Sequence, residues 1–426
     1  MSAPGYVLAI RLSSQQPFQD GKESTDQMEQ DARKVVMVRF GEIFLKSEPV
    51  RREFLNRLRD NIRAGLNGMN ADGTITITRS RILVNADSSV DLVSLLSRIF
   101  GIVDIAPVTC CGNSMDDLCT TAVKVARPHL TPHTRFAVRA RREGVEGFTS
   151  QELAAEAGSR IINAIPDLEV DLTAPQYEIF IEARKEGGLV YDTRVPGPGG
   201  LPYGTQGKAV ALISAGIDSP VAAWLMMRRG VRLVFLHIEP GRFGGLDIGR
   251  NVQNNLAALS HWIPGLEMTL ITISAEPFYQ ALMEISEPKL RCVICKRAML
   301  ELASRYAEKS GCFGIVTGDN LGQVATQTLH NLASISSGIA MPVYRPLIGY
   351  DKEEIIDLAR RIGSFTSEPG DTSCRALPPR PVTRSDAGQI HACMEHSSIR
   401  FIMEEIFKSS TRTVIKNGVF QTVSGL

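Results

Sequence analysis

Three cysteines carry the clearest chemistry in this sequence. Cys292 and Cys295 stand in the segment Arg-Cys-Val-Ile-Cys-Lys-Arg, residues 291–297, which has the pattern of a helix. Residues at i and i+3 share one face of a helix, so the two thiols could share a metal ion or a metal cluster. Cys374 lies far along the chain in a polar loop, residues 371–379. Eight cysteines in a chain of cytosolic character favour metal or redox chemistry over a disulfide framework.

A loop of small residues, Ser-Ala-Gly-Ile-Asp-Ser at 214–219, could hold an anion. An apolar run at 209–213 precedes it and is typical of a buried parallel strand. Pro220 suits the first turn of the helix that follows. Free backbone amides and the helix dipole converge on such a loop. The loop matches neither G-x-x-x-x-G-K-[ST] nor G-x-G-x-x-G, the usual nucleotide patterns.

The polar groups of this loop suit the charge of a phosphate group. Three loop amides could stabilise its charge, those of Ser214, Gly216 and Ser219. Asp218 could bind Mg²⁺ or orient the loop, although an aspartate at a helix start is as often a cap. Lys296, beside the cysteine pair, and Arg297 could neutralise phosphate charge. We therefore name Asp218, Lys296 and Cys374 as candidate catalytic residues.

The elements that must position these residues alternate along the chain. Strand-like runs at 209–213, 231–238, 266–273 and 313–317 are separated by helix-like segments near 248–262, 276–286 and 292–309. This rhythm predicts a doubly wound parallel sheet with ligands at the carboxyl ends of its strands. Four residues at those ends would border an adenine or a ribose: Leu212, Ile213, His237 and Ile238. His237 could equally be a core histidine with satisfied ring nitrogens.

The segment Thr-Gly-Asp-Asn-Leu-Gly-Gln-Val-Ala-Thr-Gln-Thr-Leu, residues 317–329, follows the fourth strand and is expected to open a helix. Gly318 would allow close approach of a ligand. Gln323 and Gln327 would lie one turn apart on the same helical face, with Gln327 as a candidate nucleotide ligand. Asp351 is a plausible N-cap of the next helix.

Two smaller α/β modules precede the loop, at residues 33–108 and 109–195. The first has the β-α-β-β-α order of a ferredoxin-like domain. A linker at 196–207 then contains eight Gly or Pro in twelve residues. Six arginines are candidate RNA contacts: Arg52 and Arg59 on a helix, and Arg135, Arg139, Arg141 and Arg142 on a strand without acids. Such runs are common where phosphates are neutralised, although the helix arginines could be a solvated face.

The rest of the sequence narrows the class of protein. The 426 residues include no apolar run near the ~18–20 residues of a membrane helix. We see no secretory signal and expect a soluble, cytoplasmic protein without a membrane partner. Residues 1–32 are mostly polar and are expected to form a poorly ordered extension.

The loop at 214–219 resembles the S-G-G-x-D-S loop of the ATP pyrophosphatases, with Ala215 in place of the usual glycine. Together with four further segments it resembles the tRNA 4-thiouridine synthetase family. These segments are Val-Arg-Phe-Gly-Glu-Ile-Phe-Leu-Lys at 38–46, Gly-Gly-Leu-Pro-Tyr-Gly-Thr-Gln at 199–206, the segment at 317–329, and Arg-Pro-Leu-Ile-Gly-Tyr-Asp-Lys at 345–352. The likeness runs from about residue 35 to residue 383.

The resemblance implies an α/β multidomain protein. A ferredoxin-like domain and a THUMP RNA-binding domain would be followed by a pyrophosphatase-loop catalytic domain at 208–390 and a C-terminal tail at 391–426. ATP with Mg²⁺ would adenylate O4 of a tRNA uridine, at position eight in this family. Sulfur from a donor would then replace the oxygen to give 4-thiouridine. The resemblance also implies a homodimer.

The route of the sulfur leaves the role of the three cysteines open. Many bacterial relatives deliver a persulfide from a C-terminal rhodanese-like domain, but only about 36 residues follow Ile390, fewer than the ~100 of such a domain. A branch without it uses three cysteines to hold an iron–sulfur cluster, here expected as 4Fe–4S, with one iron open to external sulfide. The alternatives are zinc with Cys393 or a histidine, a persulfide or disulfide relay at Cys374, or inert thiols. The remaining cysteines lack ligand spacing: Cys110, Cys111, Cys119 and Cys312.

Two other functions stay possible at this point. The same catalytic domain could act on a different tRNA base, a small molecule or a protein. Alternatively, the chain could be a tRNA-binding protein with a degenerate loop, which Ala215 weakly suggests.

Overall fold

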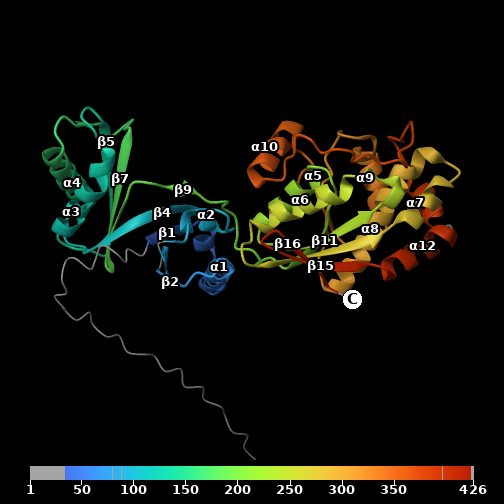
Figure 1. Cartoon of the computed structure of the whole chain (residues 1–426), viewed down its shortest axis with the longest axis horizontal. Helices are drawn as coiled ribbons and strands as arrows, with labels where there is room; N and C mark the ends of the chain where they lie inside the picture. Colours follow the sequence, from blue (N-terminus) through green and yellow to red (C-terminus); the bar gives the residue numbers. More distant parts are fainter. Residues whose placement is uncertain (1–33, 79, 88, 396, 424–426) are drawn as a thin grey trace, which may run out of the picture.

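The computed structural model describes residues 34–423 except Arg79, Ser88 and His396, so the expected extension at 1–32 lies outside the described residues. Two α/β bodies lie end to end, each built on its own sheet (Figure 1). Within the described part of the chain, no helix is long and apolar enough to cross a membrane.

The first body is organised around one strand, β4 (Ile102–Cys111). The expected ferredoxin-like part adds β1 (Lys34–Phe40), α1 (Glu48–Gly68), β2 (Gly73–Ile77), β3 (Ile82–Ala86) and α2 (Leu92–Leu96). The second module adds α3 (Met115–Ala126), β5 (Arg135–Glu143), α4 (Ser150–Ala164), β6 (Glu169–Val170), β7 (Tyr177–Arg184) and β8 (Gly187–Tyr191).

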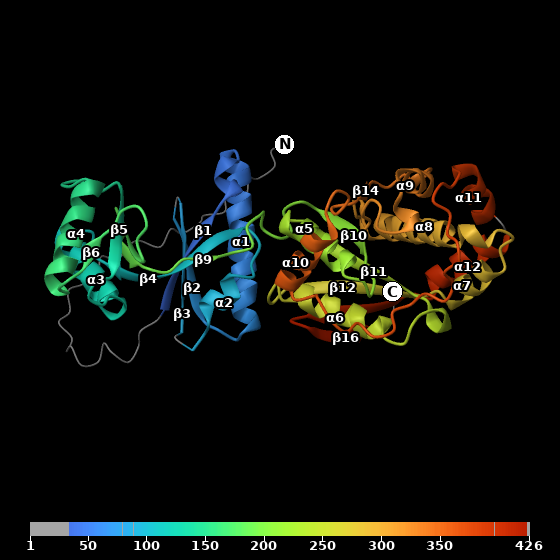
Figure 2. The same cartoon turned by 90° about the horizontal axis from the view of Figure 1, so that it is seen from above.

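Strand β4 belongs to both modules. Its residues up to Val108 pair antiparallel with β1, and from Thr109 onward it pairs antiparallel with β8. One sheet of order β2-β3-β1-β4-β8-β7-β5-β6 therefore runs through both modules, with the short β9 (Val195–Pro196) beside β4 (Figure 2). Because consecutive hydrogen-bonded strands cannot slide independently, the two modules form one continuous unit.

The second body is the expected doubly wound domain. Its alternating elements are β10 (Lys208–Leu212), α5 (Asp218–Arg228), β11 (Arg232–Glu239), α6 (Ile248–Ser260), β12 (Glu267–Ser274), α7 (Glu276–Met283), α8 (Arg291–Ser310), β13 (Ile315–Val316), α9 (Leu329–Ser336), β14 (Val343–Tyr344) and α10 (Lys352–Ile362). The first five strands of the order β14-β13-β10-β11-β12-β15-β16 run parallel.

Residues 391–423 are more than the tail that we expected. Helix α11 (Ala387–Met394) extends past the expected boundary, and α12 (Ser397–Lys408) packs against α7. A hairpin of β15 (Thr411–Lys416) and β16 (Val419–Val423) adds two antiparallel strands to the catalytic sheet. Asn417 and Gly418 between them both have positive φ, 49° and 79°, as a two-residue hairpin turn requires.

Both faces of the catalytic sheet are buried, as the apolar strands predict. Along β10, Val210 enters one core with α7, α8, α9, α11 and α12. Its neighbours Ala209 and Ala211 enter the other core with α5, α6 and α10. Side chains alternate across a strand, so each strand contributes to both cores, and the strand ends remain for polar chemistry.

The linker at 196–207 holds the two bodies together. The Gly197 amide donates to the Val103 carbonyl (2.8 Å), and the Leu201 amide donates to the Arg228 carbonyl (2.9 Å). Leu201 is buried in the ferredoxin-like core and Tyr203 in the catalytic core. This segment, although rich in Gly and Pro, is therefore fixed by both backbone and side-chain contacts.

Phe100 crosses the junction and enters the catalytic core. Its ring stacks on Trp262 with centroids 6.0 Å apart and meets the edge of Trp224 at 5.7 Å. These are the two tryptophans of the chain, and Phe100 is only 1% exposed. Such aromatic contacts combine a large buried area with a preferred ring geometry.

We expect Phe100→Ala to lower the free energy of unfolding by about 3–5 kcal/mol, because a buried ring is lost and a cavity remains. Intrinsic fluorescence would report it directly, since both tryptophans flank the ring. Phe401→Ala is the matched control, because Phe401 is 66% exposed and its loss should change stability by less than about 0.5 kcal/mol. Equal stability of the two variants would contradict the anchoring role of Phe100.

Candidate active site

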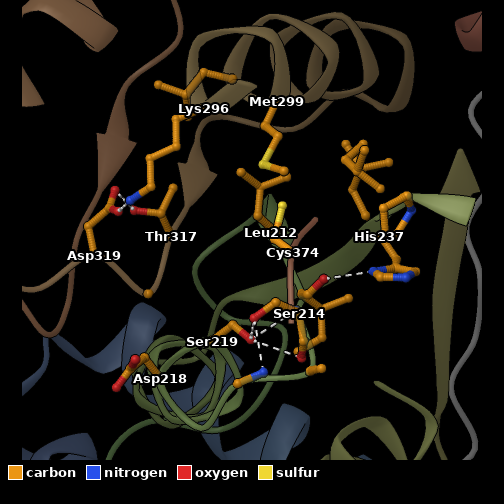
Figure 3. A pocket seen from close by; sticks show the side chains of 18 of the residues that line it. Leu212, Ser214, Asp218, Ser219, His237, Lys296, Met299, Thr317, Asp319 and Cys374 are labelled. Carbon is orange, nitrogen blue, oxygen red and sulfur yellow. Dashed lines mark hydrogen bonds and ion pairs between the residues drawn. The ribbon is translucent and has the colours of Figure 1, made fainter. Parts of the chain in front are cut away.

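A cavity of about 440 Å³ opens at the carboxyl ends of β10, β11 and β13 (Figure 3). Twelve residues that the sequence pointed to line it: Leu212, Ile213, Ser214, Gly216, Asp218, Ser219, His237, Ile238, Lys296, Gly318, Gln327 and Cys374. The sheet therefore brings the phosphate-type loop, the candidate cation and one candidate sulfur ligand to a common space. Residues that sequence reasoning missed also line it: Tyr279, Met299, Thr317, Asp319 and Thr372.

The loop at 214–219 is held in shape by its own hydroxyls. The Ser214 amide donates to Ser219 Oγ (3.0 Å), and the Gly216 amide donates to Ser214 Oγ (3.3 Å). From α6, the buried Asn255 donates its side-chain amide to the carbonyls of Ser214 (3.0 Å) and Gly216 (3.3 Å). The hydroxyls thus occupy two of the amides that we expected to meet a phosphate, and Asn255 is a supporting residue that the local pattern did not reveal.

Ala215 and Gly318 are two small residues at this loop, and the structure explains each of them differently. Ala215 is not among the residues with positive φ, so its side chain creates no backbone strain where the family has glycine. At Gly318, in contrast, an added Cβ would lie 2.8 Å from the Ser219 nitrogen. The glycine is therefore needed for contact with the start of α5 rather than for a ligand alone. Gly318 thus packs the segment after β13 against the loop.

Asp218 does not cap its helix but faces a lysine. Lys352 Nζ lies 2.8 Å from Asp218 Oδ1 and 3.4 Å from Gln323 Oε1. Lys352 begins α10, where Asp351 and Glu354 form a capping box, as the predicted N-cap requires. The lysine comes from the segment at 345–352, so the structure joins two family segments that are distant in sequence. One lone carboxylate suits Mg²⁺ only if phosphate oxygens supply further ligands.

Lys296 is also paired, with a buried aspartate (Figure 3). Its Nζ lies 2.6 Å from Asp319 Oδ1, while Thr317 Oγ1 (2.8 Å) and Arg345 Nε (3.3 Å) donate to Asp319 Oδ2. Burial alone would raise the pKa of Asp319, but Lys296, Thr317 and Arg345 outweigh it and keep the pKa below its usual value. Asp319 is therefore ionised between two cations.

Arg297 does not reach the cavity. Adjacent residues of a helix point about 100° apart, and Arg297 instead lies 2.6 Å from Glu301 Oε1 and donates to the carbonyls of Ile335 and Ser337. The structure gives it a role in joining α8 to the end of α9. The expectation that Arg297 neutralises phosphate charge at the cavity is therefore wrong.

His237 has satisfied ring nitrogens and also borders the cavity. Its Nδ1 lies 3.1 Å from the Ile213 carbonyl, and its Nε2 lies 3.1 Å from Glu239 Oε2. The ring nitrogens are thus satisfied, yet the ring lines the cavity. We infer that it shapes the wall opposite Lys296 (Figure 3).

The expected helix at Gln323 and Gln327 is absent. Gly322 has a φ of +78°, and only a 3-10 turn, Ala325–Gln327, precedes α9. The Thr328 side chain accepts from the Asn331 amide, so it caps α9 and the helix begins later than predicted. Gln323 and Gln327 consequently do not share a helical face.

The three candidate sulfur ligands lie in one region of the catalytic body. Cys292 and Cys295 lie on the first turns of α8, and burial raises the pKa of both thiols, that of Cys295 to about 12. The charge of a Cys374 thiolate adds to both shifts, which places Cys374 near the pair. Tyr279, which lines the cavity, is 3.5 Å from Cys295 Sγ. Cys393 has Glu287 as its electrostatic neighbour instead.

The loop that carries Cys374 is held by hydrogen bonds to residues 244–247. Gly244 and Cys374 form an antiparallel bridge, and the Gly245 amide donates to the Ser373 carbonyl (2.9 Å). The Asp371 amide donates to Asp247 Oδ2 (2.8 Å). These bonds fix the loop to the segment after β11.

The donor set suits a cluster held by cysteines. Within the ranges that the structure describes, no group of three or more His, Cys, Asp or Glu is close enough to hold a single metal ion. Thiolates of a cluster bind separate irons, so they need not converge on one point. The three thiols are therefore of the donor type that a cluster uses, and among the described residues they do not form a tetrahedral zinc site.

The arginines of β5 are partly neutralised by neighbouring elements. Arg139 Nε lies 2.8 Å from Glu178 Oε1, and Arg135 Nη1 lies 3.0 Å from Asp171 Oδ2. Arg142 donates to the Val145 carbonyl, while Arg141 is exposed and lines two cavities beside β5. Residues 135–142 contain no acid, but β5 ends at Glu143 and the neighbouring elements supply further acids.

The basic residues of α1 form a separate group. Arg52 and Arg59 are exposed, and Arg59 Nη2 lies 3.1 Å from Asp60 Oδ1. Helix α1 lies beside the catalytic body, whereas β5 is at the far end of the molecule (Figure 2). The structure therefore does not bring the two groups of arginines together.

Three family models match successive parts of the chain. The model described as ThiI ferredoxin-like domain matches residues 35–106, and the model described as THUMP domain matches residues 112–191. The model described as Thiamine biosynthesis protein (ThiI) matches residues 204–399.

Relatives match over most of their length. A probable tRNA sulfurtransferase of Methanothermobacter thermautotrophicus is 38% identical over 89% of this chain and 98% of the relative. A probable tRNA sulfurtransferase of Methanocaldococcus jannaschii is 38% identical over 82% of this chain and 93% of the relative. A solved 4-thiouridine synthetase, in a complex with RNA and bound ATP, matches with a TM-score of 0.82 and 31% identity over 90% of this chain and all of the other. The chain belongs to the tRNA sulfurtransferase family.

Proposed function

We propose that this protein is an ATP-dependent tRNA sulfurtransferase that converts a uridine, at position eight, to 4-thiouridine. One observation carries the proposal: Cys374 lines the same cavity as the loop at 214–219 and Lys296. Activation of O4 and delivery of sulfur to the adjacent C4 can therefore take place in one cavity. The related synthetase with RNA and ATP supports the choice of substrates.

The first step activates an oxygen that leaves poorly by itself. Uridine O4 attacks the α-phosphorus of ATP, the N3 proton is released, and the bond to the β-phosphate breaks to give pyrophosphate. The start of α5 and Lys296 stabilise the charge that develops on the phosphates. Asp218 would hold Mg²⁺ together with phosphate oxygens. Leu212, His237 and Ile238 would border the adenosine.

The second step replaces the activated oxygen. Sulfide adds to C4 of the base, and the C4–O bond breaks so that AMP leaves. A 4Fe–4S cluster held by Cys292, Cys295 and Cys374 would supply an iron with an open position for external sulfide. Because its ligands are thiolates, binding of the cluster must overcome the raised pKa of Cys295 and releases protons.

The first body would bind the RNA. A THUMP match at 112–191 and exposed arginines on β5 and α1 support this division of labour. A tRNA-binding protein with a degenerate loop is the weaker alternative, because Ala215 is compatible with the loop backbone. On the resemblance alone, we also propose a homodimer.

The function is tested by mass analysis of nucleosides from tRNA incubated with protein, ATP and sulfide. We expect 4-thiouridine from the wild type, and at least about a 100-fold slower formation with Asp218→Ala, because a group at the transition state is lost. Affinity for RNA should stay unchanged. Asp357→Ala, on the exposed side of α10, is the control. A thiolated base other than 4-thiouridine, or none, would contradict the proposal.

We expect anaerobically prepared protein to contain about four irons per chain. Cys292→Ser, Cys295→Ser and Cys374→Ser should each lose iron and the visible absorbance, since a hydroxyl is a harder and less acidic ligand than a thiol. Each should still release pyrophosphate in the presence of tRNA. Cys110→Ser is the matched control, because Cys110 is exposed on β4. Stoichiometric zinc without iron would rule out the cluster.

Binding of tRNA should weaken with salt through counterion release. Arg141→Glu should lower the affinity and reduce the slope of log Kd against log salt by about one, because one phosphate contact is lost. Arg400→Glu, on the exposed side of α12, should leave both unchanged. Filter binding over a series of salt concentrations measures them, and identical slopes for Arg141→Glu and wild type would refute the contact.

A further inference from the structure

Asp319, in the segment at 317–329, is the charged centre of the cavity wall, although the sequence alone assigned it no role. Its side chain is only 12% exposed, and both of its carboxylate oxygens have hydrogen-bond or ion-pair partners. Oδ1 meets the Lys296 ammonium at 2.6 Å, and Oδ2 accepts from Thr317 and Arg345. A buried carboxylate with such partners keeps its charge and its orientation.

The three charges have different positions relative to the cavity. Asp319, Thr317 and Lys296 line it (Figure 3). Arg345 does not; its Nη2 lies 2.7 Å from Ser336 Oγ at the end of α9. Two cations and one carboxylate leave a net charge of about +1, which suits an anionic phosphate.

A lysine needs such a partner to act at a defined point. Its ammonium is a compact charge on a flexible stem with three donors. One donor of Lys296 is directed to Asp319, and the other donors are available for a ligand. The pair therefore fixes the ammonium without consuming its capacity to bind a phosphate oxygen.

We propose that Asp319 is a positioning residue of the adenylation step, which holds the Lys296 ammonium at the phosphate end of the cavity and keeps Arg345 outside it. This inference rests on the proposed function. It assigns a role beyond the loop and the cysteines, because it makes the strand end of β13 part of the machinery that meets ATP.

If Asp319 positions Lys296, its substitution should lower kcat without raising the KM for ATP. Asp319→Asn preserves shape but removes one negative charge, so attraction of ATP should persist or increase and its KM should not rise. The Lys296 ammonium loses its anchor, and a displaced catalytic group can reduce turnover about 100-fold. We therefore expect tRNA-dependent pyrophosphate release to fall about 100-fold in kcat. A loss through misfolding alone would instead lower the melting temperature.

The test is a double-mutant cycle on pyrophosphate release with ATP and tRNA. If Asp319 acts through Lys296, then Asp319→Asn should cost kcat little or nothing further in a Lys296→Met background. Asp357→Asn is the matched control and should leave kcat unchanged in both backgrounds. Additive losses of Asp319→Asn and Lys296→Met, or a raised KM for ATP with unchanged kcat, would overturn the inference.

A milder variant keeps the test decisive if Asp319→Asn does not fold. Thr317→Val removes one donor to Asp319 without changing any charge. We expect a smaller fall in kcat that also disappears with Lys296→Met, and persistence of the fall in that background would overturn the inference. A wild type that forms neither pyrophosphate nor 4-thiouridine would instead refute the proposed function itself.

Discussion

Burial of the catalytic sheet on both faces determines where its chemistry can lie. Val210 and its neighbours on β10 alternate between two apolar cores, so the strand interior offers no place for a charged group. The carboxyl ends of the parallel strands are then the shared edge at which polar side chains can meet. The positions of the loop after β10, of His237 near the end of β11 and of Asp319 after β13 all follow from this one constraint.

The sequence sufficed for features that are local in the chain. The loop at 214–219 combines a strand, small residues and a helix start within a few positions, so its anion site could be predicted. The partners of that loop could not be predicted in the same way. Asn255, Lys352 and Asp319 are ordinary polar residues in their own segments, and only folding places them beside the loop.

Other differences between the predicted and the observed structure have two origins: backbone conformation at glycine and asparagine, and contacts between neighbouring strands. The positive φ of Gly322 delays α9, and the Asn417-Gly418 turn makes a hairpin from residues that we expected to form a tail. Arginines on β5 looked unopposed because their acids, such as Glu178, come from another strand. A run of basic residues in one strand therefore suggests a more positive surface than the folded protein has, because neighbouring strands of the sheet supply acidic partners.

Sharing of β4 by two modules has a geometric consequence. A continuous hydrogen-bonded sheet, followed by a linker fixed at both ends, makes the span from β5 to the cavity a constant of the molecule. Under the proposed function, an RNA held at the β5 end would present to the cavity the nucleotide at a set distance. Selection of one uridine among many would thereby depend on length rather than on the sequence around it.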